Sequence, residues 1–178
     1  FLDTAEMYPV NPVRAETIGR TEEIIGSWIA RNRRRTGWVI ATKITGEGGK
    51  ARGDEPITGA SVPRALEGSL RRLRTDCIDL YQLHWPNRGS YHFRQIWTFA
   101  PEQQARGQME EIAAILETLG DLVREGKIRA IGLSNESAWG TARYLSLAEA
   151  RGLPRVVSIQ NEYNLMCRLF DLDLAELC

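Results

Sequence analysis

Seven polar residues could together carry out acid–base chemistry, because each lies at or just beyond the end of a short apolar run. They are Asp3, Tyr8, Lys43, His84, Ser134, Asn135 and Gln160. A phenol has a reference pKa of about 10, but a nearby ammonium stabilises its phenolate and lowers that pKa. Lys43 could therefore tune Tyr8, while Asp3 keeps Lys43 protonated. Neutral His84 could donate a hydrogen bond to the same substrate oxygen.

Each of these residues also has an ordinary structural explanation when taken alone. An aspartate at a strand end is often a turn residue, a lysine there can extend its stem to solvent, and a single histidine is often a satisfied core group. The joint occurrence of an acid, a cation, an imidazole and a phenol favours a functional site.

Short apolar runs alternate with segments of helical periodicity along the whole chain, which predicts repeated βα units around a parallel sheet. All but the first run contain the β-branched or aromatic residues that buried strands favour. The first run begins with the chain itself, so we expect it to be a strand cut short. The five expected strands cover residues 1–3, 38–43, 77–84, 129–134 and 156–161.

The helices between these runs have clearer signals. Ser61 is a candidate N-cap, and Leu66, Leu70 and Leu73 recur on one face after it. Gly126 can end a helix in the left-handed conformation. The expected helices cover residues 21–32, begin at 61, cover 109–123, and follow 135 to end near 152.

Connections that leave strands are long, at residues 5–20, 44–60 and 85–107, whereas those that enter strands are short. In parallel α/β proteins the long loops at the carboxyl ends of the strands hold the site. The glycines at 46, 48 and 49 lack G-x-G-x-x-G spacing, which argues against a Rossmann or P-loop phosphate cradle.

Composition excludes several classes of protein. Of the 178 residues, 23 are Lys or Arg and 23 are Asp or Glu, so the net charge of zero gives no reason to expect nucleic acid or anionic lipid as a partner. The longest apolar run, 112–116, is far too short to span a membrane. Three cysteines without a CxxC pair and two histidines disfavour a disulfide scaffold or zinc module. We expect no metal, and a reducing, cytoplasmic location.

Two further clusters are open to interpretation. The basic run of Arg31, Arg33, Arg34 and Arg35 ends a helix and is expected to form a solvated face. Aromatic residues crowd the loop after His84, and they either form walls of an apolar pocket or pack the loop onto the rim of the fold. They are Trp85, Tyr91, Phe93, Trp97 and Phe99.

Four motifs occur in order along nearly the whole chain and resemble the successive signatures of the aldo-keto reductase family. The long loop after His84-Trp85-Pro86 and the segment at 160–165 make the chain most similar to the Tas-like bacterial branch of that family. The motifs are Asp3-Thr4-Ala5-Glu6-Met7-Tyr8, Ala41-Thr42-Lys43, Leu83-His84-Trp85 and Gly132-Leu133-Ser134-Asn135.

This resemblance implies a (β/α)8 TIM barrel that uses NADPH to reduce an aldehyde or ketone to an alcohol, leaving NADP+. Tyr8 would be the general acid, tuned by Lys43 and Asp3, and His84 would orient a small carbonyl substrate. The nicotinamide carboxamide would be held by Ser134, Asn135 and Gln160, and Asp3 would adjoin the cofactor.

The chain departs from the family in extent. A complete barrel has eight strands and about 250 residues, whereas residues 1–178 supply about five βα units of a single, partial barrel domain. We expect strand one and the last two units, with most of the grip on the adenosine 2′-phosphate, to lie outside it. Open barrel edges favour self-association, completion by a partner, or an inactive fragment.

Two other functions remain compatible with the residues. The chain could be a catalytically weak, regulatory NADPH-binding protein, or Lys43 could form a Schiff base as in lyases of similar architecture. The sequence leaves the physiological substrate, the choice between NADPH and NADH, and the oligomeric state undecided.

Overall fold

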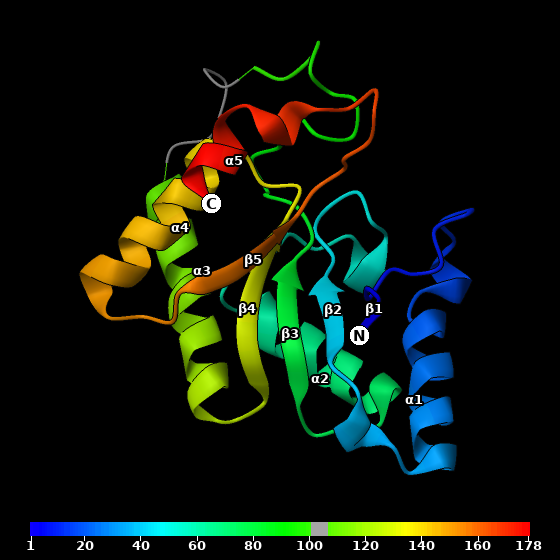
Figure 1. Ribbon diagram of the computed structural model, residues 1–178. Coiled ribbons are helices and arrows are strands. Elements are labelled where there is room, and N and C mark those ends of the chain that lie inside the picture. The colour runs from blue at the N-terminus through cyan, green and yellow to red at the C-terminus, as the bar shows by residue number, and fades with distance from the viewer. Residues whose placement is uncertain (101–106) are drawn as a thin grey trace.

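Five parallel strands form one sheet whose spatial order is the order of the chain. The computed structural model describes residues 1–100 and 107–178, so part of the long loop expected at 85–107 lies outside the described residues. Figure 1 shows the sheet curling from one edge strand to the other, like part of a barrel. All five expected strands are present: β1 (Leu2–Asp3), β2 (Ile40–Ile44), β3 (Ile78–Leu83), β4 (Ile128–Ser134) and β5 (Val156–Gln160).

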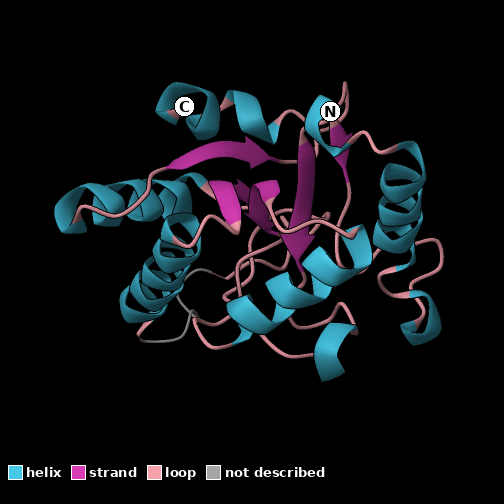
Figure 2. Cartoon of the chain, turned by 90° about the horizontal axis from the view of Figure 1, so that it is seen from below, coloured by secondary structure: helices cyan, strands magenta, loops and turns pink. Residues whose placement is uncertain are grey.

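Helices connect consecutive strands and cover the outside of the curled sheet (Figure 2). No helix within 1–100 and 107–178 has the length and apolarity needed to cross a membrane. The four expected helices are confirmed, and a short one follows β5. They are α1 (Arg20–Asn32), α2 (Ser61–Leu73), α3 (Gln108–Arg124), α4 (Ala138–Arg151) and α5 (Asp173–Leu177).

The core lies between the outer face of the sheet and the helices. Leu66, Leu70 and Leu73 of α2 are buried there, as their helical spacing predicts. Ile40 and Ile44 of β2 are also buried in this core, because alternate residues of a strand point to the same face. Burial of such side chains contributes about 25 cal/mol per Å² and holds the helices on the sheet.

The inner face of the curled sheet is tightly packed at its centre. A Cβ atom on Gly132 of β4 would lie 2.6 Å from Ser158 Oγ and 2.9 Å from Gln82 Cγ. Glycine therefore lets the strands on either side of β4 bring polar side chains together.

Helix boundaries agree with the sequence signals except at the start of α2. Gly126 and Gly152 are left-handed, with φ of 74° and 62°, as expected of residues that end helices. Ser61 is the first residue of α2 and not its N-cap, because a turn precedes the helix. In that turn Thr58 N donates to Ser61 Oγ at 2.8 Å, and Ser61 N donates to Thr58 Oγ1 at 3.1 Å.

The expectation of a solvated arginine run is wrong for its last member. Arg31, Arg33 and Arg34 are exposed, but the side chain of Arg35 is 23% exposed and donates to Cys77 O at 2.7 Å and Asp79 Oδ2 at 2.8 Å. The chain reverses after α1 at a left-handed residue, which brings Arg35 to the amino ends of the strands.

Helices α1 and α2 approach closely at Gly26. A Cβ atom there would lie 2.2 Å from Arg72 O and 2.6 Å from Leu73 C, and both are backbone atoms that cannot move aside. Next to this contact the buried Glu22 accepts hydrogen bonds from Thr42 Oγ1 and Arg72 Nε, each at 2.6 Å.

Gly26→Ala is expected to lower the free energy of unfolding by about 1–3 kcal/mol, the usual cost of overpacking, although alanine favours helix. Urea denaturation measures the change. Gly68→Ala in α2 is the matched control, because its Cβ would meet only the flexible end of Arg72, at 3.0 Å. Equal stabilities of the two variants would contradict a close helix contact at Gly26.

Candidate active site at the carboxyl ends of the strands

The structure brings all seven sequence-predicted residues to one end of the sheet, which we call the mouth. Asp3 ends β1, Lys43 lies in β2, and His84 follows β3. Ser134 and Gln160 end β4 and β5 and are paired in register. Tyr8 and Asn135 lie in the loops after β1 and β4. Because parallel strands share one carboxyl edge, residues far apart in sequence meet there.

Lys43 is buried and fully hydrogen-bonded. Its side chain is 2% exposed, and Nζ donates to Asp3 Oδ1 at 2.9 Å, Asp3 Oδ2 at 2.8 Å and Thr4 O at 2.8 Å. Burial lowers the pKa of Lys43, and the hydrogen bond and charge of Asp3 oppose that shift. All three ammonium protons are used, so Lys43 presents no free amine to attack a carbonyl. The geometry does not support the Schiff-base alternative.

The Asp3 carboxylate also accepts hydrogen bonds from two other strands. Gln82 Nε2 of β3 lies 3.3 Å from Oδ1, and Gln160 Nε2 of β5 lies 3.1 Å from Oδ2. The sequence analysis missed Gln82. It lies two residues before His84, so the period of two along a strand could have placed it on the same face.

Tyr8 lies beside both Lys43 and His84. Lys43 Nζ is 5.5 Å from the centroid of the phenol ring, and the rings of Tyr8 and His84 are 5.7 Å apart at 70°. Burial, and then the charge of Asp3, raise the pKa of Tyr8. The expectation that Lys43 lowers this pKa is therefore wrong in this arrangement, because burial disfavours the charged phenolate and the Asp3 carboxylate adds to that effect.

His84 is buried and neutral. Burial, and then the positive charge of Lys43, lower its pKa from 6.5 to about 3, against the opposing effect of Asp3. Its Nδ1 is buried without a hydrogen-bond partner among the described residues. The imidazole is thus uncharged at neutral pH, the form that the sequence analysis expects.

Ser134 and Asn135 join the ends of three strands. Ser134 Oγ donates to Gln160 O at 2.8 Å, and Asn135 N donates to the same oxygen at 3.0 Å. Asn135 Nδ2 donates to His84 O at 2.9 Å, and the residue is left-handed with φ of 53°. One hydroxyl and two amide side chains thus gather beside the acid–base residues.

The loop aromatics divide between two environments. The ring of Trp85 lies 4.7 Å from that of His84, at the mouth. Tyr91, Phe93 and Trp97 line a groove of about 700 Å³, which the segment after β5 lines from the other side. Phe99 packs edge-on against Tyr91 at 5.9 Å. Trp85 thus lies beside His84 and Phe99 packs within the loop, and the interpretation that some of these aromatics form walls of a substrate pocket stays a prediction.

Comparison with known proteins identifies relatives of the chain along its whole length. The model of the "Aldo/keto reductase family" matches residues 1–178. Protein tas of Escherichia coli (strain K12) is 42% identical over 183 residues, which cover 99% of this chain and 51% of that protein. The uncharacterized oxidoreductase YrpG of Bacillus subtilis is 34% identical, over 98% of this chain and 48% of that protein.

Solved structures give the same result. An aldo/keto reductase from Klebsiella pneumoniae, in complex with NADP and acetate, has a TM-score of 0.64 and 28% identity, over 99% of this chain and 47% of that one. The thermostable aldo-keto reductase Tm1743, with the inhibitor epalrestat, has a TM-score of 0.66 and 31% identity, over 99% of this chain and 50% of that one.

The chain spans about half the length of the curated relatives named above, 51% of the first. Its five curled parallel strands, with a helix between each strand and the next, correspond to part of a (β/α)8 barrel. The order of the strands, the motifs at their carboxyl ends and the family match over residues 1–178 agree, and this chain belongs to the aldo/keto reductase family.

Proposed function

We propose that this chain carries the acid–base site of an NADPH-dependent oxidoreductase that reduces an aldehyde or ketone to an alcohol. One observation carries the proposal: Tyr8 lies between the buried Lys43–Asp3 pair and a neutral His84. The NADP bound to the Klebsiella pneumoniae relative supports the choice of cofactor. We propose that this activity belongs to the whole barrel and that residues 1–178 form part of that single barrel domain.

The residues at the mouth fit the nicotinamide end of such a cofactor. A carboxamide has one C=O acceptor and an NH₂ donor, and the hydroxyl of Ser134 with the amides of Asn135 and Gln160 offers both kinds of partner. Gln160 is exposed at the mouth and is already joined to Asp3, which would adjoin the cofactor. When bound, NADPH would supply the hydride.

In the proposed reaction, the Tyr8 hydroxyl gives its proton to the carbonyl oxygen as the carbonyl carbon gains the hydride. The raised pKa of Tyr8 keeps the phenol protonated before the reaction but also makes it a weaker acid, so its neighbours must stabilise the charge that develops on its oxygen. Negative charge then grows on the substrate oxygen and on Tyr8, where the Lys43 ammonium and the neutral His84 stabilise it more strongly than in the ground state. Solvent returns the proton to Tyr8.

A second candidate, a catalytically weak NADPH-binding protein, is favoured by one observation. No hydrogen bond joins the Tyr8 hydroxyl to Lys43 or His84 in the described part of the chain, so the tuning that would make Tyr8 a better acid is incomplete. NADPH binding without turnover across a broad panel of carbonyl compounds would support this candidate.

Self-association is proposed because apolar side chains are exposed near the β5 edge. Val157 is 65% exposed, and Leu165 and Met166 are 92% and 95% exposed. A second copy of the chain could cover these residues and the unpaired edge. Sedimentation equilibrium is expected to give a dimer or a larger species. Val157→Lys should shift the chain toward monomer, and a monomer at all concentrations would contradict the proposal.

Tyr8→Phe is expected to reduce turnover with an activated aromatic aldehyde by about 10²–10⁴-fold, the usual contribution of a general acid. NADPH affinity should stay the same, because Phe retains the ring and removes only the hydroxyl. The measurements are NADPH oxidation by absorbance and NADPH binding by fluorescence. Unchanged turnover would rule out Tyr8 as the acid.

The neutral state of His84 predicts how stability depends on pH. Between pH 6.5 and about 3 the unfolded chain binds a proton at His84 that the folded chain does not, so stability falls as the pH falls through this range. The slope from this group approaches about 1.4 kcal/mol per pH unit, and it vanishes above pH 7.

Urea denaturation at pH 7 and pH 5 tests this dependence. His84→Gln lacks the titrating group and should lose less stability than the unaltered chain between the two pH values. Equal losses would show that His84 is already protonated, or solvated, in the folded chain.

A further inference from the structure

Two loops at the mouth are joined by a buried ion pair that takes no part in the proposed chemistry. Arg88, in the loop after β3, and Glu136, in the loop after β4, have side chains that are 6% and 4% exposed. Arg88 Nη1 donates to Glu136 Oε2 at 3.0 Å, and Nη2 donates to Oε1 of the same carboxylate and to Ser137 Oγ, the latter at 3.2 Å. We call Arg88, Glu136 and Ser137 the Arg88 clasp.

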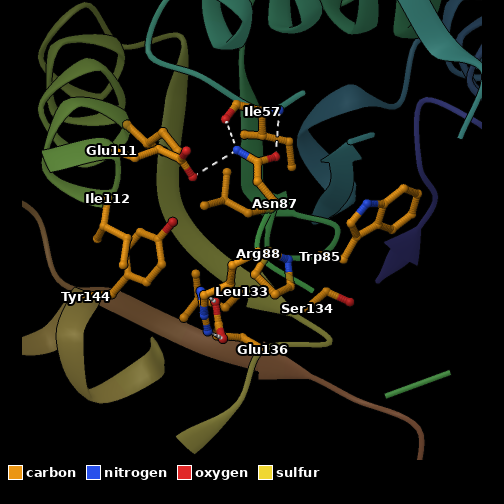
Figure 3. A pocket seen from close by; sticks show the side chains of 13 residues that line it. Ile57, Trp85, Asn87, Arg88, Glu111, Ile112, Leu133, Ser134, Glu136 and Tyr144 are labelled. Atoms are coloured by element: carbon orange, nitrogen blue, oxygen red, sulfur yellow. Dashed lines mark hydrogen bonds and ion pairs between the residues drawn. The ribbon is translucent and has the colours of Figure 1, made fainter. Parts of the chain in front are cut away.

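Figure 3 shows Arg88 and Glu136 in contact close to Ser134, one of the residues proposed to hold the cofactor. The same residues line one side of a small cavity of about 20 Å³ beneath the mouth, which is closed on its other side by Glu111 and Tyr144. The ion pair of the clasp therefore lies near Ser134, with which it shares the lining of this cavity.

A buried ion pair between two loops contributes little net stability, because both charges must be removed from water. Removing each ion from water costs several kcal/mol, and apolar residues of the same volume are often at least as stable. What a two-pronged guanidinium–carboxylate pair provides instead is a fixed orientation, because both bonds must be aligned together. The geometry of the clasp is thus better explained by positioning than by stability.

The first turn of α4 leaves room for the clasp. A Cβ atom on Gly140 would lie 2.2 Å from both Arg88 Nη2 and Glu136 Oε1. Glycine within a helix costs about 1 kcal/mol relative to alanine. The helix therefore carries an unfavourable residue at the one place where a side chain would displace the ion pair.

Asn135, the residue before Glu136 of the clasp, lies in one of the two loops that the clasp joins and is held by the other. This residue is left-handed with φ of 53°, a conformation that disfavours side chains by about 1–2 kcal/mol even though Asn tolerates it better than most. Ser90 Oγ donates to Asn135 O at 2.9 Å, and His92 Nε2 lies 3.1 Å from Glu136 O. The loop after β3 thus holds the backbone of Asn135 and Glu136 from one side while Gln160 holds it from the other.

We propose that Arg88 is a positioning residue, which acts through Glu136 to hold Ser134 and Asn135 in the arrangement that receives the nicotinamide carboxamide. This inference rests on the proposed function and adds a residue to it. Without the clasp, Asn135 relaxes toward extended conformations, and the carboxamide site must be ordered at the expense of binding energy. Loss of the clasp therefore weakens cofactor binding more than it slows the proton transfer by Tyr8.

The test is NADPH affinity, measured by fluorescence on the purified whole barrel of which residues 1–178 form part. Arg88→Met, which keeps an unbranched apolar stem but removes the guanidinium and its charge, is expected to weaken binding about tenfold. Arg88→Lys should recover part of the loss, because an ammonium pairs with Glu136 without the two-pronged geometry. Gly140→Ala should weaken binding in the same direction while leaving every charge in place.

Arg72→Met is the matched control, because it breaks another ion pair with a buried carboxylate, that with Glu22, between α1 and α2 and away from the mouth. It should destabilise the chain without changing NADPH affinity. Amide hydrogen exchange gives a readout that is independent of cofactor: Arg88→Met should accelerate exchange at residues 132–141 and leave residues 61–73 unchanged.

Unchanged affinity in Arg88→Met, or equal loss of affinity in Arg88→Met and Arg72→Met, would overturn the positioning role. Amide hydrogen exchange that accelerates uniformly along the whole chain of Arg88→Met would also overturn the positioning role, because uniform acceleration would indicate a general loss of stability. Failure of the proposed function looks different: the unaltered whole barrel would then bind no NADPH, before any variant is compared, and the cofactor role of the clasp would fall with it.

Discussion

The buried ammonium of Lys43 is the constraint on which the mouth depends. An ammonium removed from water loses several kcal/mol of hydration, so the fold must supply all of its hydrogen bonds from protein atoms. Asp3 and Thr4 supply them, and both belong to the very short edge strand β1 or the residue after it. The hydrogen bonds of the buried Lys43 ammonium in β2 are therefore satisfied only when β1 pairs with β2 in the correct register. That register also places Tyr8 beside the ammonium.

Ion pairs repeatedly join successive βα units in this chain. Glu22 and Arg72 connect α1 with α2, Asp3 and Lys43 connect β1 with β2, and the Arg88 clasp connects the loops after β3 and β4. The apolar core between sheet and helices is non-directional and stabilises many relative placements almost equally. Charged pairs of defined geometry select one of them. The apolar core thus supplies most of the stability, and the ion pairs specify how each unit sits on the next.

The sequence alone predicts the elements well and their electrostatics poorly. Strands and helices follow from local periodicity, so the leucines of α2 and the glycines at 126 and 152 behave as their spacing indicates. Gathering of the polar residues at one edge follows from parallel topology. The direction of the Tyr8 pKa shift does not, because it depends on how far the folded chain buries the phenol and on how close Asp3 lies to it. Arg35 and Gln82 were missed for a similar reason, since their partners lie on other strands and only the folded register brings them together.

Each strand pairs only with its neighbours in the chain, so the sheet can grow in the order in which a ribosome makes it. The Lys43–Asp3 pair belongs to the first two strands and can form while the rest of the chain is still being synthesised. The hydrogen bond from Gln160 to Asp3 can form only after β5 has been made. The Lys43–Asp3 pair can thus form before Gln160 reaches it, and a folding chain can pass through a stage in which its buried charge is already neutralised while β5 has not yet joined the sheet.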